Sequence, residues 1–416
     1  MDDPFFHISK LNTYYALTAV YTCVAHVWVA VVSRKAGGKN QISYSFPPSN
    51  EVTKKLAIVT GSNTGIGFET AKRLVREYGW DVILACRSKD KALIARNLIN
   101  DDYNKYNTNS DSCSNGKAIV LEPVLDLSDF NSVRKYVDAI QNEYDNIDVL
   151  INNAGRNSGG RSPGNPELDL MFQSNYLGHF LLTELLLKNE LLLSSSTTTN
   201  GSGKGGNKVI NLSSAMHHFS KGDALEGNGF ESVASPDYWK RRAMYSEKDT
   251  PDNLYSATKL AAILHSVELN RRYSDKNLMS IACDPGGVNS NIWRGFPLWV
   301  RRHVFDKLYL TTEEGSEPII AAAIRDDLTL DKENSIIYLQ PYANPFLIFG
   351  GRFFADSSSS RSVATLTSSS RQGPMPPFAE MHGPYVGHLP TIPRLPKNTE
   401  AAAETLWNVS EQLTKL

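Results

Sequence analysis

The sequence predicts an α/β fold built on a doubly wound parallel sheet of about seven strands. Short apolar, β-branched runs alternate along the chain with longer stretches of helical character. The runs are apolar at successive positions, as expected of strands buried on both faces of a sheet. The first run ends in a glycine-rich turn that leads directly into a helix.

Strands and helices follow one another from Lys54 onward. The first strand is LAIVT, and the second, DVILAC, follows one helix later. The strands are expected at 56–60, 81–86, 118–124, 148–152, 209–212, 280–283 and 336–339. The helices are expected at 66–78, 89–99, 128–144, 167–193, 255–272, 313–326 and 400–413.

The chain has 416 residues, whereas one α/β core usually stops growing at roughly 250–300. Additional segments are therefore expected around one domain. Two polar, low-complexity runs read as surface loop insertions within that domain. The expected parts are an N-terminal anchor at 1–35, a linker at 36–53, the domain at 54–345 with insertions at 101–116 and 194–207, and an irregular extension at 346–416 that ends in a helix.

The composition excludes several classes of protein. Lysine and arginine total 43 and aspartate and glutamate 44, so the net charge of −1 does not suit a protein that binds nucleic-acid phosphates. The four cysteines are far apart and form no CxxC pair or Cys/His cluster. We therefore expect no metal site and no disulfide framework, and reduced thiols in a cytosolic setting.

Residues 11–32 contain no Asp, Glu, Lys or Arg and would span about 33 Å as a helix, enough to cross a bilayer. Arg34 and Lys35 follow this stretch, which places the rest of the chain on the cytoplasmic side. We expect an uncleaved single-pass anchor, with the endoplasmic reticulum as the membrane. A cleaved targeting segment and a buried soluble helix are the alternatives.

The turn TGSNTGIG occupies 60–67, between the first strand and the first helix. Gly61 permits a tight turn, Gly65 lets the backbone approach a pyrophosphate, and Gly67 allows close packing of helix on strand. The N-terminus of the helix would stabilise the negative charge of a phosphate. A glycine-rich turn can also simply connect a strand to a helix, but its place after the first strand favours a dinucleotide site.

With further motifs in the same order, the chain resembles the short-chain dehydrogenase/reductase family, which has a Rossmann-type fold. These motifs are VLDLSD, NNAG, SNYLGHFLLT, NLSS, YSATK and DPGGVNS. The resemblance covers about 54–340. It implies cofactor contacts from Gly61, Ser62, Asn63, Thr64, Gly65, Ile66, Gly67, Asp126, Leu127, Asn153, Ala154, Gly155, Tyr255, Lys259, Pro285, Gly286 and Val288, and catalytic roles for Asn175, Ser214, Tyr255 and Lys259.

Within this family the sequence is most similar to the retinol-dehydrogenase-like branch. SNYLGHFLLT, NLSS followed by His217, the apolar N-terminus and the terminal AAAETLWNVSEQLTKL carry that similarity. The polar insertions, the proline-rich run near 374–394 and the long stretch between Ser214 and Tyr255 depart from it. Family members often pair through two long helices, here 167–193 and 255–272, so a homodimer is a further expectation.

The residue types suit hydride transfer between a nicotinamide and a carbonyl. Tyr255 would act as general acid or base, and Lys259, one helical turn later, is expected to lower the pKa of the tyrosine. A serine would steady the developing alkoxide. Strand alternation separates Ser213 from Ser214, and the family pattern favours Ser214. By resemblance, Asn175 would hold a water that links Lys259 to solvent.

The end of the second expected strand bears on the choice of cofactor. An acidic residue there would pair with the ribose of NAD, but the chain has Cys86 and Arg87. Arg87 can bind a 2′-phosphate in bidentate fashion, so we expect NADP(H). An exposed arginine without a ligand is the alternative.

The pocket is expected between 215–254 and 288–305, with an aromatic lining that suits a lipophilic substrate, retinoid-like or steroid-like. His217 and His218 are interpreted as wall residues. A reductase of a pigment or lipid precursor and a nucleotide-binding scaffold without turnover are the alternative functions. The expected wall residues are Met216, Phe219, Phe230, Trp239, Trp293, Phe296 and Trp299.

Overall fold

A computed structural model describes most of the chain from Lys54 onward. The described residues are 54–106, 116–193, 206–220, 231–247, 254–273, 275–290, 292, 309–328, 330, 335–340, 389–391, 393, 395–396 and 398–416. The expected anchor at 11–32 and the linker at 36–53 lie outside them. Within the described part of the chain, no helix is both long and apolar enough to cross a bilayer.

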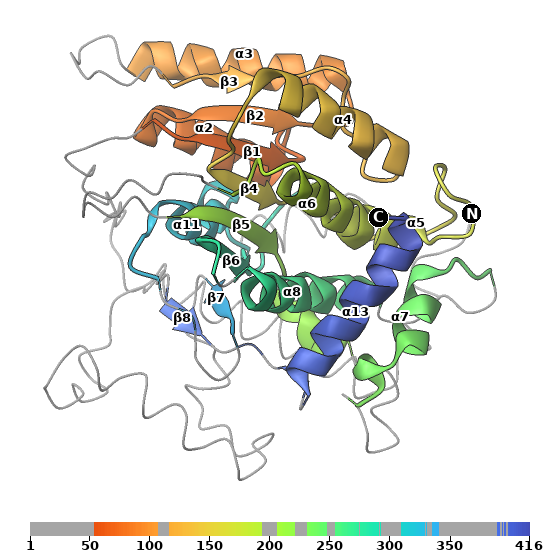
Figure 1. The fold of residues 1–416 in the computed structure, drawn as a ribbon. Helices are drawn as coiled ribbons and strands as arrows, with labels where there is room; N and C mark the ends of the chain where they lie inside the picture. The colour runs from red at the N-terminus through yellow and green to blue at the C-terminus, as the bar shows by residue number, and fades with distance from the viewer. Residues whose placement is uncertain are drawn as a thin grey trace, which may run out of the picture.

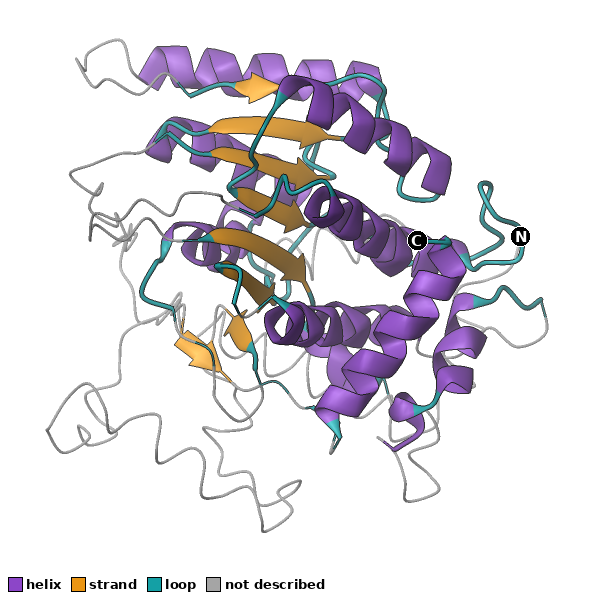
Figure 2. Ribbon diagram, viewed as in Figure 1, coloured by secondary structure: helices purple, strands orange, loops and turns teal. Residues whose placement is uncertain are grey.

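One eight-stranded sheet forms the centre of the molecule (Figures 1 and 2). Its order is β3-β2-β1-β4-β5-β6-β7-β8, with every neighbouring pair parallel except β7 and β8. The doubly wound parallel sheet is therefore confirmed, and an antiparallel edge strand is added to it. The strands are β1 (Leu56–Thr60), β2 (Asp81–Ala85), β3 (Ala118–Ile119), β4 (Val149–Asn152), β5 (Asn207–Leu212), β6 (Leu278–Cys283), β7 (Ile337–Gln340) and β8 (Leu389–Thr391).

Helices cover both faces of this sheet (Figure 2). The side chains of β1 alternate between two cores: Ala57 and Val59 face one core, and Ile58 faces the other. The helices are α2 (Gly65–Tyr78), α3 (Lys89–Tyr106), α4 (Phe130–Glu143), α5 (Leu170–Phe172), α6 (Gly178–Lys188), α7 (Pro236–Ala243), α8 (Leu254–Arg272), α11 (Thr312–Ile324) and α13 (Thr399–Thr414), with a π-helix η2 (Gln173–Leu177) and 3₁₀ helices η3 (Ala215–Phe219) and η5 (Glu231–Ala234).

Three expected elements differ from those observed. The helix expected at 89–99 continues as α3 to Tyr106, since its polar residues form an exposed helical turn as readily as a loop. The strand expected at 118–124 has two residues, and Pro123 has no N–H with which to continue the ladder. The helix expected at 167–193 is divided into α5, η2 and α6 and begins only after Asp169, whose carboxylate accepts hydrogen bonds from the backbone N–H groups of Met171 and Phe172.

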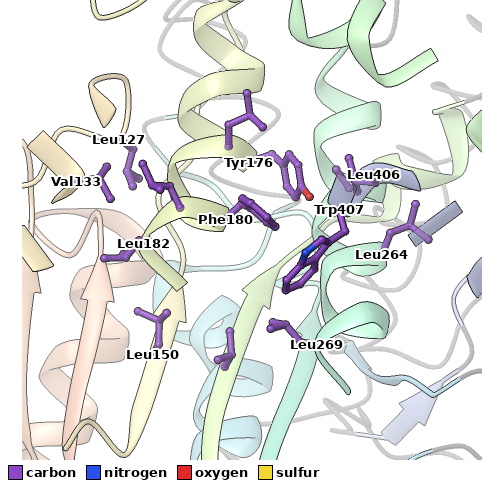
Figure 3. Close-up of a cluster of buried hydrophobic side chains, with 14 of the residues drawn as sticks. Leu127, Val133, Leu150, Tyr176, Phe180, Leu182, Leu264, Leu269, Leu406 and Trp407 are labelled. Atoms are coloured by element: carbon purple, nitrogen blue, oxygen red, sulfur yellow. The ribbon is translucent and has the colours of Figure 1, made fainter. Parts of the chain in front are cut away.

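The C-terminal helix α13 belongs to the main core. It lies across α8 and packs on the same side of the sheet as α6 (Figure 1). Trp407 points toward Phe180 of α6, with 5.1 Å between ring centroids, and Tyr176 lies beside Phe180 (Figure 3). At the C-terminal end of α13, the backbone oxygen of Thr414 accepts a hydrogen bond from Arg134 of α4 at 2.7 Å. The boundary expected at 345 therefore does not separate the C-terminal residues from the domain.

This packing also bears on the expected dimer. The faces of α6 and α8 that contact α13 are buried within the chain, and α8 is buried along almost its whole length. Pairing of two chains through these faces would require α13 to leave. A homodimer remains a prediction, and it would need a different surface.

Replacing Trp407 by alanine tests how much α13 contributes. The indole is 2% exposed, and the guanidinium carbon of Arg272 lies 4.4 Å from its ring centroid. Removing a buried indole usually costs about 3–5 kcal/mol of the free energy of unfolding, and urea denaturation of the full chain will measure it. Asn408→Ala, at an exposed position on the same helix, is the control and should change it by less than about 0.5 kcal/mol. A loss below about 1 kcal/mol for Trp407→Ala would contradict this packing.

Candidate active site

The glycine turn after β1 has the close packing that the sequence predicts. Gly61 and Gly65 have φ angles of 67° and 63°, in the left-handed region that favours glycine. The Gly61 N–H donates to the Ala85 backbone oxygen at 2.8 Å and so joins the turn to β2. A Cβ on Gly67 would lie 2.3 Å from Asn153 Nδ2, so α2 can begin this close to β4 only with glycine there.

The first turn of α2 suits a phosphate. Thr64 is the N-cap residue of this helix, its side chain makes no capping hydrogen bond, and the first turn holds no acidic residue. By contrast, the N-terminus of α4 is capped by Asp129, whose carboxylate accepts from the Asn131 N–H at 2.9 Å. The backbone N–H groups of the first turn and the dipole of α2 therefore suit an anion.

The other predicted residues of this turn have distinct surroundings. The Ser62 hydroxyl is buried and donates to the Val59 backbone oxygen at 2.8 Å, so only the Ser62 backbone is left for a ligand. Asn63 is partly exposed and Thr64 is exposed. Ile66 packs against the core between the sheet and α2.

The ends of β1 and β4 are joined by one side chain. The Thr60 hydroxyl oxygen accepts from the backbone N–H groups of Asn153 and Ala154, each at 2.9 Å. Asn153 Nδ2 donates back to the Thr60 carbonyl at 2.7 Å. β1 and β4 are neighbours at which the strand order reverses direction, which is where open α/β sheets bind their ligands.

Residues after β2 and β3 form the adenosine side of the expected site. Arg87 is exposed and has no hydrogen-bond or ion-pair partner among the described residues. Asp126 accepts from both the N–H and the hydroxyl of Ser128, at 2.9 and 2.7 Å, and Leu127 is buried beside Gly178. Arg87 is thus free to meet a ligand, while the Asp126 carboxylate is held in place.

The loop after β6 lies near the glycine turn. A Cβ on Gly65 would come within 3.9 Å of Ser290 Cβ and of no other described atom within 4 Å. Pro285 and Val288 are buried, and Gly286 has a φ of 79°. The space beside Gly65 would therefore accept a ligand rather than a side chain.

Tyr255 and Ser214 meet at the carboxyl end of the sheet. Ser214 lies just after β5, is partly exposed, and lies close enough to Tyr255 of α8 for its hydroxyl to lower the pKa of the phenol. Ser213 is 2% exposed, and its hydroxyl donates to the Lys259 backbone oxygen at 2.8 Å. The structure thus places Ser214 beside the tyrosine and assigns Ser213 to the packing of β5 on α8.

Lys259 and Asn175 approach the same point. The Lys259 ammonium donates to the Leu212 backbone oxygen at 2.9 Å. A Cβ on Gly155 would lie 3.8 Å from Lys259 Nζ and 3.9 Å from Asn175 Oδ1. Asn175 is itself fixed by Arg156, whose N–H donates to Oδ1 at 2.9 Å and whose carbonyl accepts from Nδ2 at 2.8 Å. The four predicted catalytic residues are therefore brought together.

Burial sets the protonation of these groups. It raises the pKa of Tyr255 above its ordinary value, the charge of Asp284 adds to this, and the hydrogen bond with Ser214 opposes it. Burial lowers the pKa of Lys259 to about 8, and Asp284 opposes that shift. The sequence predicts that Lys259 lowers the pKa of Tyr255, and that prediction is wrong for this structure. Lys259 Nζ lies over the ring, 5.5 Å from its centroid, and donates to Leu212 rather than to the phenol.

The π-helix η2 was not foreseen. It contains Asn175, and a single π turn within a helix often marks a functional site. Its residues QSNYL read as ordinary helix, so the sequence pattern gave no signal for it.

Most of the expected aromatic wall stays a prediction. Met216, two residues after Ser214, is 41% exposed. Trp239 was wrongly predicted as a wall residue: it is fully buried, and its indole N–H donates to the Val233 backbone oxygen at 2.8 Å. His217 is also buried, with its ring against Tyr338. The side chains of His218, Phe219, Phe230, Trp293, Phe296 and Trp299 lie outside the described residues.

The fold and the site define a dinucleotide-binding α/β protein. The family model described as short chain dehydrogenase matches residues 55–220, which include Asn175 and Ser214 but end before Tyr255. Retinol dehydrogenase 11 of Mus musculus is 32% identical over 280 residues, covering 66% of this chain and 74% of that protein. This chain therefore belongs to the short-chain dehydrogenase family.

Other known proteins show the same relationship. Retinol dehydrogenase 12 of Bos taurus is 31% identical over 275 residues, covering 66% of this chain and 74% of that protein. WW domain-containing oxidoreductase of Homo sapiens is 34% identical over 259 residues, covering 61% and 54%. A crystal structure of an uncharacterized protein from Mycobacterium Paratuberculosis shares the fold, with a TM-score of 0.51, 22% identity, and coverage of 88% of this chain and 95% of that chain.

The predicted family and its retinol-dehydrogenase-like branch are confirmed. The chain is an oxidoreductase of CH–OH and C=O groups, in a family that uses NAD(P) cofactors.

Proposed function

We propose that this chain is a membrane-tethered, NADP(H)-dependent reductase of a carbonyl group on a lipophilic molecule. Retinoid-like or steroid-like molecules are the preferred substrate class. The observation that carries the proposal is that Tyr255 and Ser214 lie together at the carboxyl end of the sheet, with Lys259 buried beside the tyrosine ring. The names of the relatives, retinol dehydrogenases 11 and 12, support the substrate class.

The nicotinamide would supply the hydride. Tyr255 would give its hydroxyl proton to the substrate oxygen as the hydride adds to the carbonyl carbon. Ser214 would donate a hydrogen bond to the same oxygen and stabilise the developing alkoxide. The raised pKa of Tyr255 keeps the phenol protonated at neutral pH, as proton donation to a carbonyl requires. The cellular ratio of NADPH to NADP would set the direction, and it favours reduction.

Lys259 and Asn175 would return the proton. With a pKa of about 8, Lys259 is mostly protonated at pH 7 and yet loses its proton readily. Asn175 is held rigidly on both sides of its amide by Arg156. A water held between Asn175 and Lys259 would connect the tyrosine to solvent.

The proposed cofactor contacts come from the glycine turn after β1 and from the loops after β2, β3, β4 and β6. The N-terminus of α2 and the space beside Gly65 would hold the pyrophosphate. Asp126 and Leu127 would lie at the adenine, and Asn153, Ala154, Gly155, Pro285, Gly286 and Val288 at the nicotinamide half. The absence of a carboxylate after β2 and the exposed guanidinium of Arg87 support NADP(H) over NAD(H).

Replacing Tyr255 by phenylalanine should abolish turnover while NADPH still binds. General acid catalysis contributes at least about a hundredfold, so kcat for reduction of lipophilic aldehydes should fall by at least that factor. Tyr273→Phe, just beyond the same helix, is the matched control and should keep wild-type kcat. NADPH binding without turnover on any aldehyde or ketone by the wild-type protein would instead indicate a nucleotide-binding scaffold.

Replacing Arg87 by alanine should weaken NADPH and leave NADH unaffected. A charged hydrogen bond is worth about 1.5–3 kcal/mol, so the KM for NADPH should rise roughly tenfold to a hundredfold. Arg96→Ala, which removes a partly exposed arginine on α3, is the control. An equal change in KM for both cofactors would contradict a 2′-phosphate contact.

Residues 11–32 are proposed as the tether, with the catalytic domain on the cytoplasmic face of the endoplasmic reticulum. The full-length protein should stay with membranes in alkaline carbonate, whereas a chain that begins at Lys54 should be released. Release of the full-length protein would disprove the tether and leave the proposed chemistry untouched.

A further inference from the structure

His179 is a buried histidine that none of the roles above uses. It lies on α6, four residues after Asn175, and is 3% exposed. Its Nδ1 is 3.0 Å from the Asn175 backbone oxygen, and its Nε2 is 2.8 Å from Thr60 Oγ1. The imidazole therefore bridges the π turn that carries Asn175 and the end of β1.

The partners of the ring fix its tautomer. A carbonyl oxygen can only accept, so Nδ1 carries the proton that bonds Asn175. Burial and the positive charge of Lys259 lower the pKa of His179 to about 4, which keeps the ring neutral at pH 7. Nε2 is then an acceptor, and the Thr60 hydroxyl must donate to it.

This orientation completes the hydrogen bonds of Thr60. Its single proton goes to His179 at 2.8 Å rather than to the Ile151 carbonyl at 3.4 Å. Its lone pairs then face the N–H groups of Asn153 and Ala154. One directed chain of hydrogen bonds thus runs from the loop after β4, through Thr60 and His179, to the backbone of Asn175.

We propose that His179 is a positioning residue, which sets the Asn175 backbone relative to the cofactor loop and thereby the path that returns the proton to Tyr255. The proposal rests on the reductase function proposed above. The role lies in the proton path rather than in cofactor affinity, so removing the ring should lower kcat more than it raises the KM for NADPH.

Two substitutions of His179 test this role in the full-length protein. His179→Leu removes both hydrogen bonds and should lower kcat roughly tenfold to a hundredfold, with a less than threefold change in the KM for NADPH. It should also displace the pH profile of kcat, since the proton path is altered. His179→Asn keeps a donor near the Nδ1 position and should recover most of kcat.

His265→Leu is the matched control. His265 is equally buried, on α8 among the rings of Tyr176, Phe180 and Trp407, and burial lowers its pKa to about 3. Its removal should lower the melting temperature without displacing the pH profile of kcat. If His179→Leu only lowers the melting temperature, as His265→Leu does, the positioning role is overturned.

Nitrogen NMR of the wild-type imidazoles supplies a readout that does not depend on turnover. His179 should show a protonated Nδ1 and an unprotonated Nε2 at pH 7, and the reverse tautomer would overturn the directed chain. An active wild-type enzyme whose His179→Leu variant keeps kcat would overturn the positioning role alone. A wild-type protein that binds NADPH and reduces nothing would overturn the proposed function, and this role with it.

Discussion

The site depends on the junction between the carboxyl ends of β1 and β4. The Thr60 hydroxyl holds the Asn153 and Ala154 N–H groups, and Asn153 returns a bond to the Thr60 carbonyl. Gly67 allows α2 to begin against this junction, because any Cβ there would collide with Asn153. The glycine turn and the loop after β4 are therefore one unit, and the positions of the helix N-terminus and of Gly155 follow from it.

Burial provides the second constraint. At the carboxyl end of the sheet it raises the pKa of the tyrosine and lowers the pKa of the lysine. Both shifts arise mainly from desolvation, since Lys259 Nζ donates to a backbone carbonyl rather than to the phenol. The result is a protonated phenol next to a lysine that exchanges its proton near neutrality.

Much of this could be predicted from the sequence, because strand runs and glycine turns are local signals. Each of the seven predicted strands is present, and the motif residues meet at one edge of the sheet as expected of parallel strands. The π turn could not be predicted, since its residues fit an ordinary helix. Trp239 was misassigned because an aromatic near a site looks the same in sequence whether it faces a pocket or the core. The direction of the Tyr255 shift depends on where Lys259 Nζ points, which spacing along a helix does not fix.

The contacts of the C-terminal helix α13 could not be predicted from the sequence either, and they reach the site. Tyr176 follows Asn175 within η2, and its hydroxyl lies 3.0 Å from Ser410 Oγ of α13. Its ring packs on Phe180, which packs on Trp407 (Figure 3). The π turn is thus held from within by His179 and Thr60 and from outside by α13. Residues 399–414, the most distant in sequence from the glycine turn, therefore help to fix the position of Asn175. The sequence places this helix in an extension outside the domain, whereas in the structure it packs on the element that carries Asn175.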